Sequence, residues 1–261
     1  MSCIDQNHYH DEELDPCHLF DTYAGADKTI SKKELVENHL KFIYNLFLSG
    51  SVKGETLIHI SIGSCVTEAF IAADFFKNII LLESSDCCMK TLEKWINNEP
   101  GAPEQSHFAE FACSLKGKST EWKKHEEKAR RALKKVVKWD ITKENPLGAV
   151  VLPQGDCLIA LYHLEFVSKG QDMYIILLKK LSSLLKIGGH LILVAVINMS
   201  YYTVGQHKFS GLKCDEEFIQ KALTEAGCTI VKSETHKSHF QSPLIDYESI
   251  AYFVSRKERL V

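Results

Sequence analysis

The chain has 261 residues, of which 45% are hydrophobic and 25% charged, and it carries a formal net charge of −3. This length suffices for one large α/β core, and the composition is that of an ordinary globular protein. The small negative charge does not favour general binding to nucleic acid or to a membrane surface. No apolar run is long enough to span a membrane, and the N-terminus lacks the features of a signal peptide, so we expect a cytoplasmic protein.

Cysteine and histidine spacings do not indicate a metal site. The nine cysteines include no Cys-x-x-Cys pair, which favours reduced thiols, several of them buried. His8, His10, Cys17 and His18 lie close together in the sequence, but their spacing matches no zinc-binding pattern. We therefore expect no bound metal.

The first fifty residues divide into a polar stretch and a helix. Residues 1–17 show no periodic pattern, and we expect them to form a loose tail. Ser31 and Glu34 have the spacing of a capping box, and apolar residues at helical spacing follow. Gly50 is placed to end this helix.

The next segment has the layout of a nucleotide-type cofactor site. An apolar strand over 56–62 enters a small-residue turn at Gly63, a helix over 65–76 follows, and a second apolar strand over 78–83 ends on Glu83. Such a turn brings backbone close to the ligand, and the acid accepts hydrogen bonds from ribose hydroxyls. A dinucleotide fingerprint has three glycines where this loop has one, so the pattern indicates an adenosine-containing ligand without specifying which.

The rest of the chain continues to alternate helices and strands. The alternation implies a mostly parallel sheet with helices on both faces and ligands at the carboxyl ends of the strands. The last two strands have no helix between them and should form an antiparallel pair at the sheet edge. The predicted elements are helices over 86–97, 119–138, 171–186 and 215–226, strands over 156–161, 190–197, 228–232 and 249–255, and a loop containing Tyr201 and Tyr202.

The helix predicted over 119–138 is basic and amphipathic. A helix of this kind can bind nucleic acid, but no aromatic or glycine-rich loop accompanies the charge. A solvated basic face on a helix that packs on the core is therefore the favoured interpretation.

Several short motifs stand in a fixed order along the chain. They are Val52-Lys53-Gly54, Leu92-Glu93-Lys94-Trp95 with Glu99-Pro100, Pro146-Leu147-Gly148-Ala149, Asp156-Cys157, Leu184-Leu185-Lys186-x-Gly188-Gly189, and Tyr202-x-x-Gly205-x-x-Lys208-Phe209-Ser210. This set resembles the nicotinamide, indolethylamine and phenylethanolamine N-methyltransferase family over residues 18–258.

The resemblance implies a Rossmann-like methyltransferase fold with a mostly parallel seven-stranded sheet, a C-terminal antiparallel hairpin and helices on both faces. It implies a single domain over 1–261, in which residues 18–50 form an N-terminal cap over the cofactor site. The implied methyl donor is S-adenosyl-L-methionine, the substrate a small amine or N-heterocycle, and the protein a monomer.

The resemblance also implies the site residues. Glu83 replaces the usual ribose-binding aspartate, Asp140 with Ile141 holds the adenine amino group, and Tyr23 closes over the cofactor. The implied cofactor set is Tyr23, Ser61, Gly63, Ser64, Cys65, Glu83, Ser84, Cys88, Asp140, Ile141 and Leu161.

Two further residues are implied for the reaction itself. Glu165 stands where amine-methylating members place an acid near the substrate nitrogen, and Tyr202 lies in the substrate loop. Methyl transfer needs an aligned, unprotonated nitrogen, and a carboxylate can orient an ammonium and accept its proton.

Ordinary structural roles stay open for each of these residues. Glu165 is equally compatible with a surface position, Glu83 with a solvent-facing strand end, Asp140 with a cap, and Tyr23 with a packed aromatic ring. His59 has apolar neighbours, which favours a hydrogen-bonded core histidine.

The chain departs from the family pattern at the cofactor loop. Where the family has Asp-x-Gly-x-Gly-Pro-Thr, this chain has His59, Ser61, Gly63, Ser64 and Cys65. Other family residues are replaced by His18, Thr67, Cys88 and Leu161, and the acid that nicotinamide-methylating members use is Ala195.

These departures leave more than one function open. The loss of the acid at Ala195 argues against nicotinamide as the substrate. The altered loop leaves open a paralogue without transfer activity that serves as a binding or accumulating protein. An NAD-type oxidoreductase shares the turn-plus-acid layout but fits the glycine pattern and the terminal hairpin less well. A catalytic function also requires that His59, Ile62 and Cys65 leave room for the donor.

Overall fold

The computed structural model describes residues 18, 22–23, 33–60, 63, 65–117, 119–239 and 242–261. The predicted tail over 1–17, with His8, His10 and Cys17, lies outside the described residues, as do Ser31, Ser61, Ile62 and Ser64. Among the helices of the described part, none is both long and apolar enough to cross a membrane.

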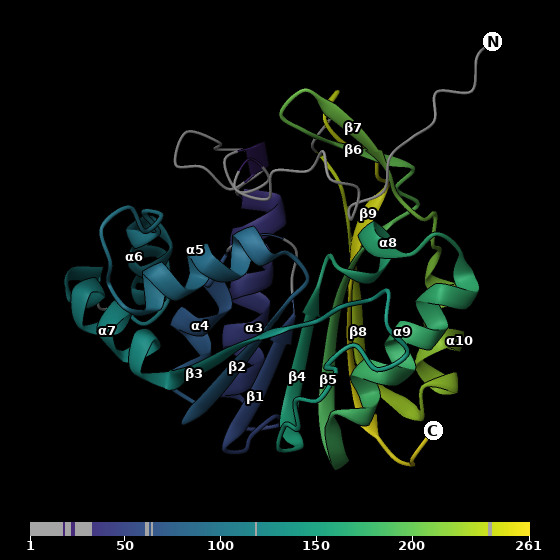
Figure 1. The fold of residues 1–261 in the computed structure, drawn as a ribbon, viewed down its shortest axis with the longest axis horizontal. Coiled ribbons are helices and arrows are strands. Elements are labelled where there is room, and N and C mark those ends of the chain that lie inside the picture. The colour runs from purple at the N-terminus through teal and green to yellow at the C-terminus, as the bar shows by residue number, and fades with distance from the viewer. Residues whose placement is uncertain are drawn as a thin grey trace.

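The centre of the structure is a seven-stranded sheet in the order β3-β2-β1-β4-β5-β9-β8 (Figure 1). Strands β1 to β5 are mutually parallel, and β9 is antiparallel to both of its neighbours. The predicted sheet and its terminal hairpin are therefore confirmed. The strands are β1 Thr56–Ile60, β2 Asn78–Glu83, β3 Leu133–Lys138, β4 Gly155–Leu161, β5 Leu185–Ile197, β8 Cys228–Lys237 and β9 Ser249–Lys257.

Helices cover both faces of this sheet. In Figure 1, α4, α5, α6 and α7 gather at one side and α8, α9 and α10 at the other. A π-helical turn, η1 Lys33–Glu37, leads into α3, and a short 3₁₀ turn, η2 Ser119–Glu121, precedes α7. The helices are α3 Asn38–Leu48, α4 Thr67–Ala72, α5 Asp86–Ile96, α6 Ser106–Ser114, α7 Trp122–Ala132, α8 Leu164–Val167, α9 Gln171–Ser183 and α10 Glu216–Glu225.

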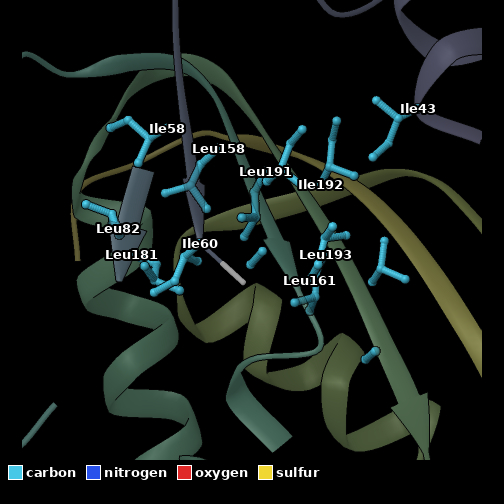
Figure 2. Packing of buried hydrophobic residues seen from close by; sticks show 14 of the residues in the cluster. Ile43, Ile58, Ile60, Leu82, Leu158, Leu161, Leu181, Leu191, Ile192 and Leu193 are labelled. Carbon is cyan, nitrogen blue, oxygen red and sulfur yellow. The ribbon is translucent and has the colours of Figure 1, made fainter. Parts of the chain in front are cut away.

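The core lies where the central strands meet the helices. Figure 2 shows Ile58, Leu158 and Leu191 from three neighbouring strands packed together, and all three are fully buried. Ile43 of α3 and Leu181 of α9 are also fully buried. Each such side chain contributes about 1.5–3 kcal/mol by leaving water. Burial on both faces explains why β4 and residues 191–197 of β5 are nearly continuous apolar runs.

The helix predicted over 119–138 is wrong over its last six residues, 133–138. Helix α7 ends at Ala132, and β3 begins at once. Val136 and Val137 pair with Leu81 and Leu82 of β2 instead of extending a helical stripe. Backbone pairing with a neighbouring strand and the β-branched side chains outweigh the local helical spacing.

Other boundaries also differ from the sequence prediction. The loop predicted around Tyr201 and Tyr202 is an antiparallel hairpin, β6 Tyr201–Val204 with β7 His207–Ser210, which follows the carboxyl end of β5 (Figure 1). Strand β5 begins at Leu185, inside the predicted helix, and β8 extends to Lys237. Helices α6 and α8 were not predicted, because each is short and lacks a long apolar repeat.

Candidate active site

The candidate site lies at the carboxyl edge of the parallel strands. Gly63 follows β1, Glu83 ends β2, and Leu161 ends β4. Strand ends from one parallel sheet meet at a common edge, which is where such folds bind ligands. Gly63 is buried with a φ of 86°, a backbone conformation that suits glycine. Ser61 and Ser64 belong to the same turn in the sequence and lie outside the described residues.

Glu83 is a buried acid at the end of β2. It is 2% exposed, so the alternative of a solvent-facing strand end is wrong. Its Oε1 accepts a hydrogen bond of 2.9 Å from the Ser85 amide. Burial raises the pKa of Glu83 to about 8, against the opposing effects of the Ser85 and Ser84 amides and of Lys138. The Ser84 hydroxyl is also buried, and it has no hydrogen-bond partner within the described part of the chain.

Asp140 and Ile141 follow β3 beside the end of β2. The Trp139 amide donates to the Glu83 carbonyl over 2.8 Å, which holds the two strand ends together. Asp140 Oδ1 accepts from the amide and the hydroxyl of Thr142, at 3.1 and 2.6 Å. The Thr142 hydrogen bond lowers the pKa of Asp140 despite some burial. Asp140 therefore caps a turn, and Ile141 beside it is half-buried.

The two cysteines near the cofactor loop are protected thiols. Cys65 Sγ donates to the Thr67 hydroxyl over 3.5 Å, and burial raises the pKa of Cys65 to about 12. Cys88 is fully buried in the first turn of α5, where its amide donates to the capping Ser85 hydroxyl. The half-buried Cys65 thiol is therefore protonated and a poor nucleophile, and the Cys88 thiol is enclosed in the core, so neither side chain is equipped for chemistry.

Tyr23 connects the N-terminal region to the β6–β7 hairpin. Its hydroxyl lies 2.8 Å from the Thr203 carbonyl and 2.9 Å from the Leu244 carbonyl, and it accepts from the Thr203 amide over 3.2 Å. Burial raises the pKa of Tyr23, against the Thr203 hydrogen bond. Tyr23 is thus a buried, hydrogen-bonded residue whose polar end faces this hairpin.

Glu165 is fully buried in α8, so the alternative of a surface glutamate is wrong. Its Oε1 accepts a hydrogen bond of 2.9 Å from the Val196 amide of β5. Its Oε2 is buried without a hydrogen-bond partner among the described residues. Burial raises the pKa of Glu165 to about 7, against the hydrogen bond from Val196. A buried oxygen of this kind is suited to accept a hydrogen bond from a bound ligand.

The residue after this acid belongs to an aromatic cluster. Tyr202 is fully buried, with its ring centroid 4.5 Å from that of Phe166 and 5.4 Å from that of Phe209, with which it is stacked. Phe166 follows Glu165 directly in α8. Helix α8 and the hairpin therefore meet at Phe166 and Tyr202, one residue along α8 from Glu165; Glu165 and Tyr202 are the two residues that the resemblance assigned to the reaction. Leu161, on the neighbouring strand end, pairs with Val194.

Two charged residues of this region were not singled out from the sequence. Asp246 accepts hydrogen bonds from the Ser200 and Tyr201 amides, at 2.7 and 2.8 Å, and so fixes the start of β6. Glu68 is buried in α4, close to His59. The only signal for Glu68 in the sequence was an acid followed by the apolar run Ala69-Phe70-Ile71.

Comparisons with known proteins agree with this architecture. The chain is 36% identical to nicotinamide N-methyltransferase of Sus scrofa over 90% of this chain and 89% of that protein. It is 30% identical to indolethylamine N-methyltransferase of Mus musculus over 95% of this chain and 94% of that protein.

The fold is also that of a solved methyltransferase. The N-methyltransferase NodS from Bradyrhizobium japonicum, in complex with S-adenosyl-L-homocysteine, matches with a TM-score of 0.55 and 12% identity, covering 94% of this chain and all of that one. The family model described as the NNMT/PNMT/TEMT family matches residues 2–258. On the sequence, the sheet and the site together, this chain belongs to the NNMT/PNMT/TEMT family of methyltransferases.

Proposed function

We propose that the protein transfers a methyl group from S-adenosylmethionine to the nitrogen of a small amine or N-heterocycle. Membership of the family supports the reaction class and the donor. One observation supports this site most directly. The fully buried Glu165 has a carboxyl oxygen without a hydrogen-bond partner among the described residues, and the next residue, Phe166, packs on the ring of Tyr202. This is the arrangement needed to receive an ammonium or an N–H group.

The residues at the ends of β2 and β3 fit the donor. The buried carboxyl of Glu83 and the hydroxyl of Ser84, for which the described part of the chain supplies no hydrogen-bond partner, offer polar contacts for ribose hydroxyls. Ile141 offers an apolar surface. Gly63 allows the backbone after β1 to approach the ligand closely. The donor, when bound, supplies an electrophilic methyl group on a sulfonium.

Proton control in the reaction falls to Glu165. The substrate nitrogen must lose its proton before it can attack, and Glu165 Oε2, which has no hydrogen-bond partner among the described residues, can accept it. With a pKa of about 7, Glu165 is close to the operating pH of a general base. Tyr202, packed between Phe166 and Phe209, forms an apolar wall that excludes water and limits how the substrate ring can lie.

Nicotinamide is disfavoured as the substrate. Ala195 lies near the carboxyl end of β5, fully buried and paired with Ala251, so neither side chain offers a hydrogen bond to a carboxamide. We therefore propose an amine or a ring nitrogen without such a group. We also propose a cytoplasmic monomer with one domain, in which residues 18–50 act as a cap over the donor.

Calorimetric titration with S-adenosylhomocysteine tests donor binding. We expect a micromolar or tighter dissociation constant, and the absence of heat at millimolar ligand would reject the proposal. Mass spectrometry of a panel of amines, with nicotinamide included, then tests transfer. We expect a methylated amine and less product from nicotinamide than from the best amine.

A second candidate is a paralogue that binds a ligand without transferring a methyl group. It is favoured by the altered cofactor loop and by the Tyr23 hydroxyl, which is already engaged by two backbone carbonyls of the hairpin region. It predicts cooperative melting with no shift in Tm on addition of the donor. A methylated product from any amine would reject it.

A further inference from the structure

A buried carboxylate joins the two segments that flank the cofactor loop. Glu68 of α4 is 2% exposed, and its Oε1 lies 2.6 Å from His39 Nε2 and 2.5 Å from the Thr67 hydroxyl. Its Oε2 lies 3.3 Å from His59 Nε2. His39 and His59 are themselves almost fully buried. The carboxylate thus has a histidine at each oxygen.

The positions of these residues explain what the carboxylate connects. His59 is the next-to-last residue of β1, before the loop, whereas Thr67 and Glu68 open α4, after the loop. His39 belongs to α3, which packs against α4. One side chain therefore links the strand that enters the loop, the helix that leaves it, and the helix beside them.

Burial opposes the ionisation of Glu68, whereas the nearby His59 and the hydrogen bonds from His39 and Thr67 lower its pKa. Burial also lowers the pKa of His59, whose Nε2 lies close to the carboxylate without a hydrogen bond within the described part of the chain. An ionised carboxylate away from water is stable only where donors surround it, so the surrounding groups are held to a narrow geometry. A neighbouring anchor acts on the same segment, because the Val66 amide donates to Gln105 Oε1 over 3.1 Å.

We propose that Glu68 is a positioning residue for the two segments that flank the cofactor loop, with His59 of β1 on one side and Thr67 of α4 and His39 of α3 on the other. An effect of Glu68 on the affinity for the methyl donor depends on the function proposed above. An effect of Glu68 on the two flanking segments does not depend on that function, because the contacts of Glu68 are present without any ligand.

The variant Glu68→Gln keeps the shape of the side chain and removes its charge. We expect it to weaken S-adenosylhomocysteine binding about 10- to 100-fold, the scale of a small misplacement at a site. We also expect faster hydrogen exchange in peptides over residues 57–70 of the ligand-free protein. His59→Gln keeps the Glu68 carboxylate and should also weaken binding and speed hydrogen exchange over residues 57–70. This variant replaces Glu68→Gln in the test if Glu68→Gln does not fold.

A matched control separates positioning from general stability. Lys257 is also fully buried and charged, and it donates to the Ser182 and Leu185 carbonyls at the opposite edge of the sheet. Lys257→Met should lower Tm while leaving the dissociation constant and the exchange of residues 57–70 unchanged.

The outcomes distinguish the two proposals. If the wild type does not bind S-adenosylhomocysteine, the proposed function fails, and the exchange comparison still decides the role of Glu68. The positioning role is overturned if a folded Glu68→Gln variant exchanges residues 57–70 at the wild-type rate. It is also overturned if the wild type binds and Glu68→Gln binds equally well.

Discussion

Glu165 should cost the protein stability at high pH, and Glu165→Gln should remove that cost. Burial raises the pKa of this carboxyl from 4.5 to about 7. An acid with a raised pKa in the folded state binds its proton more tightly there than in the unfolded chain. Stability therefore falls as the pH rises from about 4.5 to about 7 and stays low above that. The full difference is worth about 3 kcal/mol.

The glutamine variant keeps the acceptor for the Val196 amide and cannot ionise. At pH 5 its Tm should be close to that of the wild type, whereas at pH 8.5 it should be higher by roughly 5–10 °C. Its methyl transfer should fall about 100-fold or more, because the proton acceptor is lost. A more stable but less active variant is the expected signature of a buried functional acid.

Thermal melts of both proteins at the two pH values test this reasoning. Glu127→Gln, on an exposed position of α7, is the control and should melt like the wild type at each pH. The account of Glu165 as a desolvated acid is refuted if the difference in Tm between wild type and variant does not grow with pH.

Three further results are expected. Tyr23→Phe removes the hydroxyl that bridges to the hairpin region and should lower the free energy of unfolding in urea by about 1 kcal/mol, with faster hydrogen exchange in β6; unchanged values would contradict the bridge. Maleimide labelling at pH 7.5 should modify the exposed Cys87 before Cys65, whose pKa burial raises to about 12, and mass spectrometry showing the reverse order would refute the protected thiol. Gly54→Ala should lower the free energy of unfolding by about 1–3 kcal/mol, because the added Cβ would overlap Asp156. A Tm equal to that of the wild type would show that the backbone can shift to relieve this overlap at little cost.

The sequence determined most of the sheet and the identity of the family. Strands β1, β2 and β4 and residues 191–197 of β5 are mostly buried apolar residues. They are visible in the sequence because these segments must be covered on both faces. The absence of a helix between the last two strands was enough to predict their antiparallel pairing. Glu83, Glu165 and Tyr202 were singled out because they stand at strand ends or in family motifs.

Only the tertiary structure decided features that depend on distant partners. Strand β3 is strand because β2 lies beside it, and its own apolar spacing was that of a helix. The burial of Glu165, the Tyr23 bridge across 180 residues, and the enclosure of Glu68 by His39 and His59 all join segments far apart in the sequence. Local periodicity reports which face of an element is buried. It carries no information on which side chains meet there, because that is set by how the strands and helices pack.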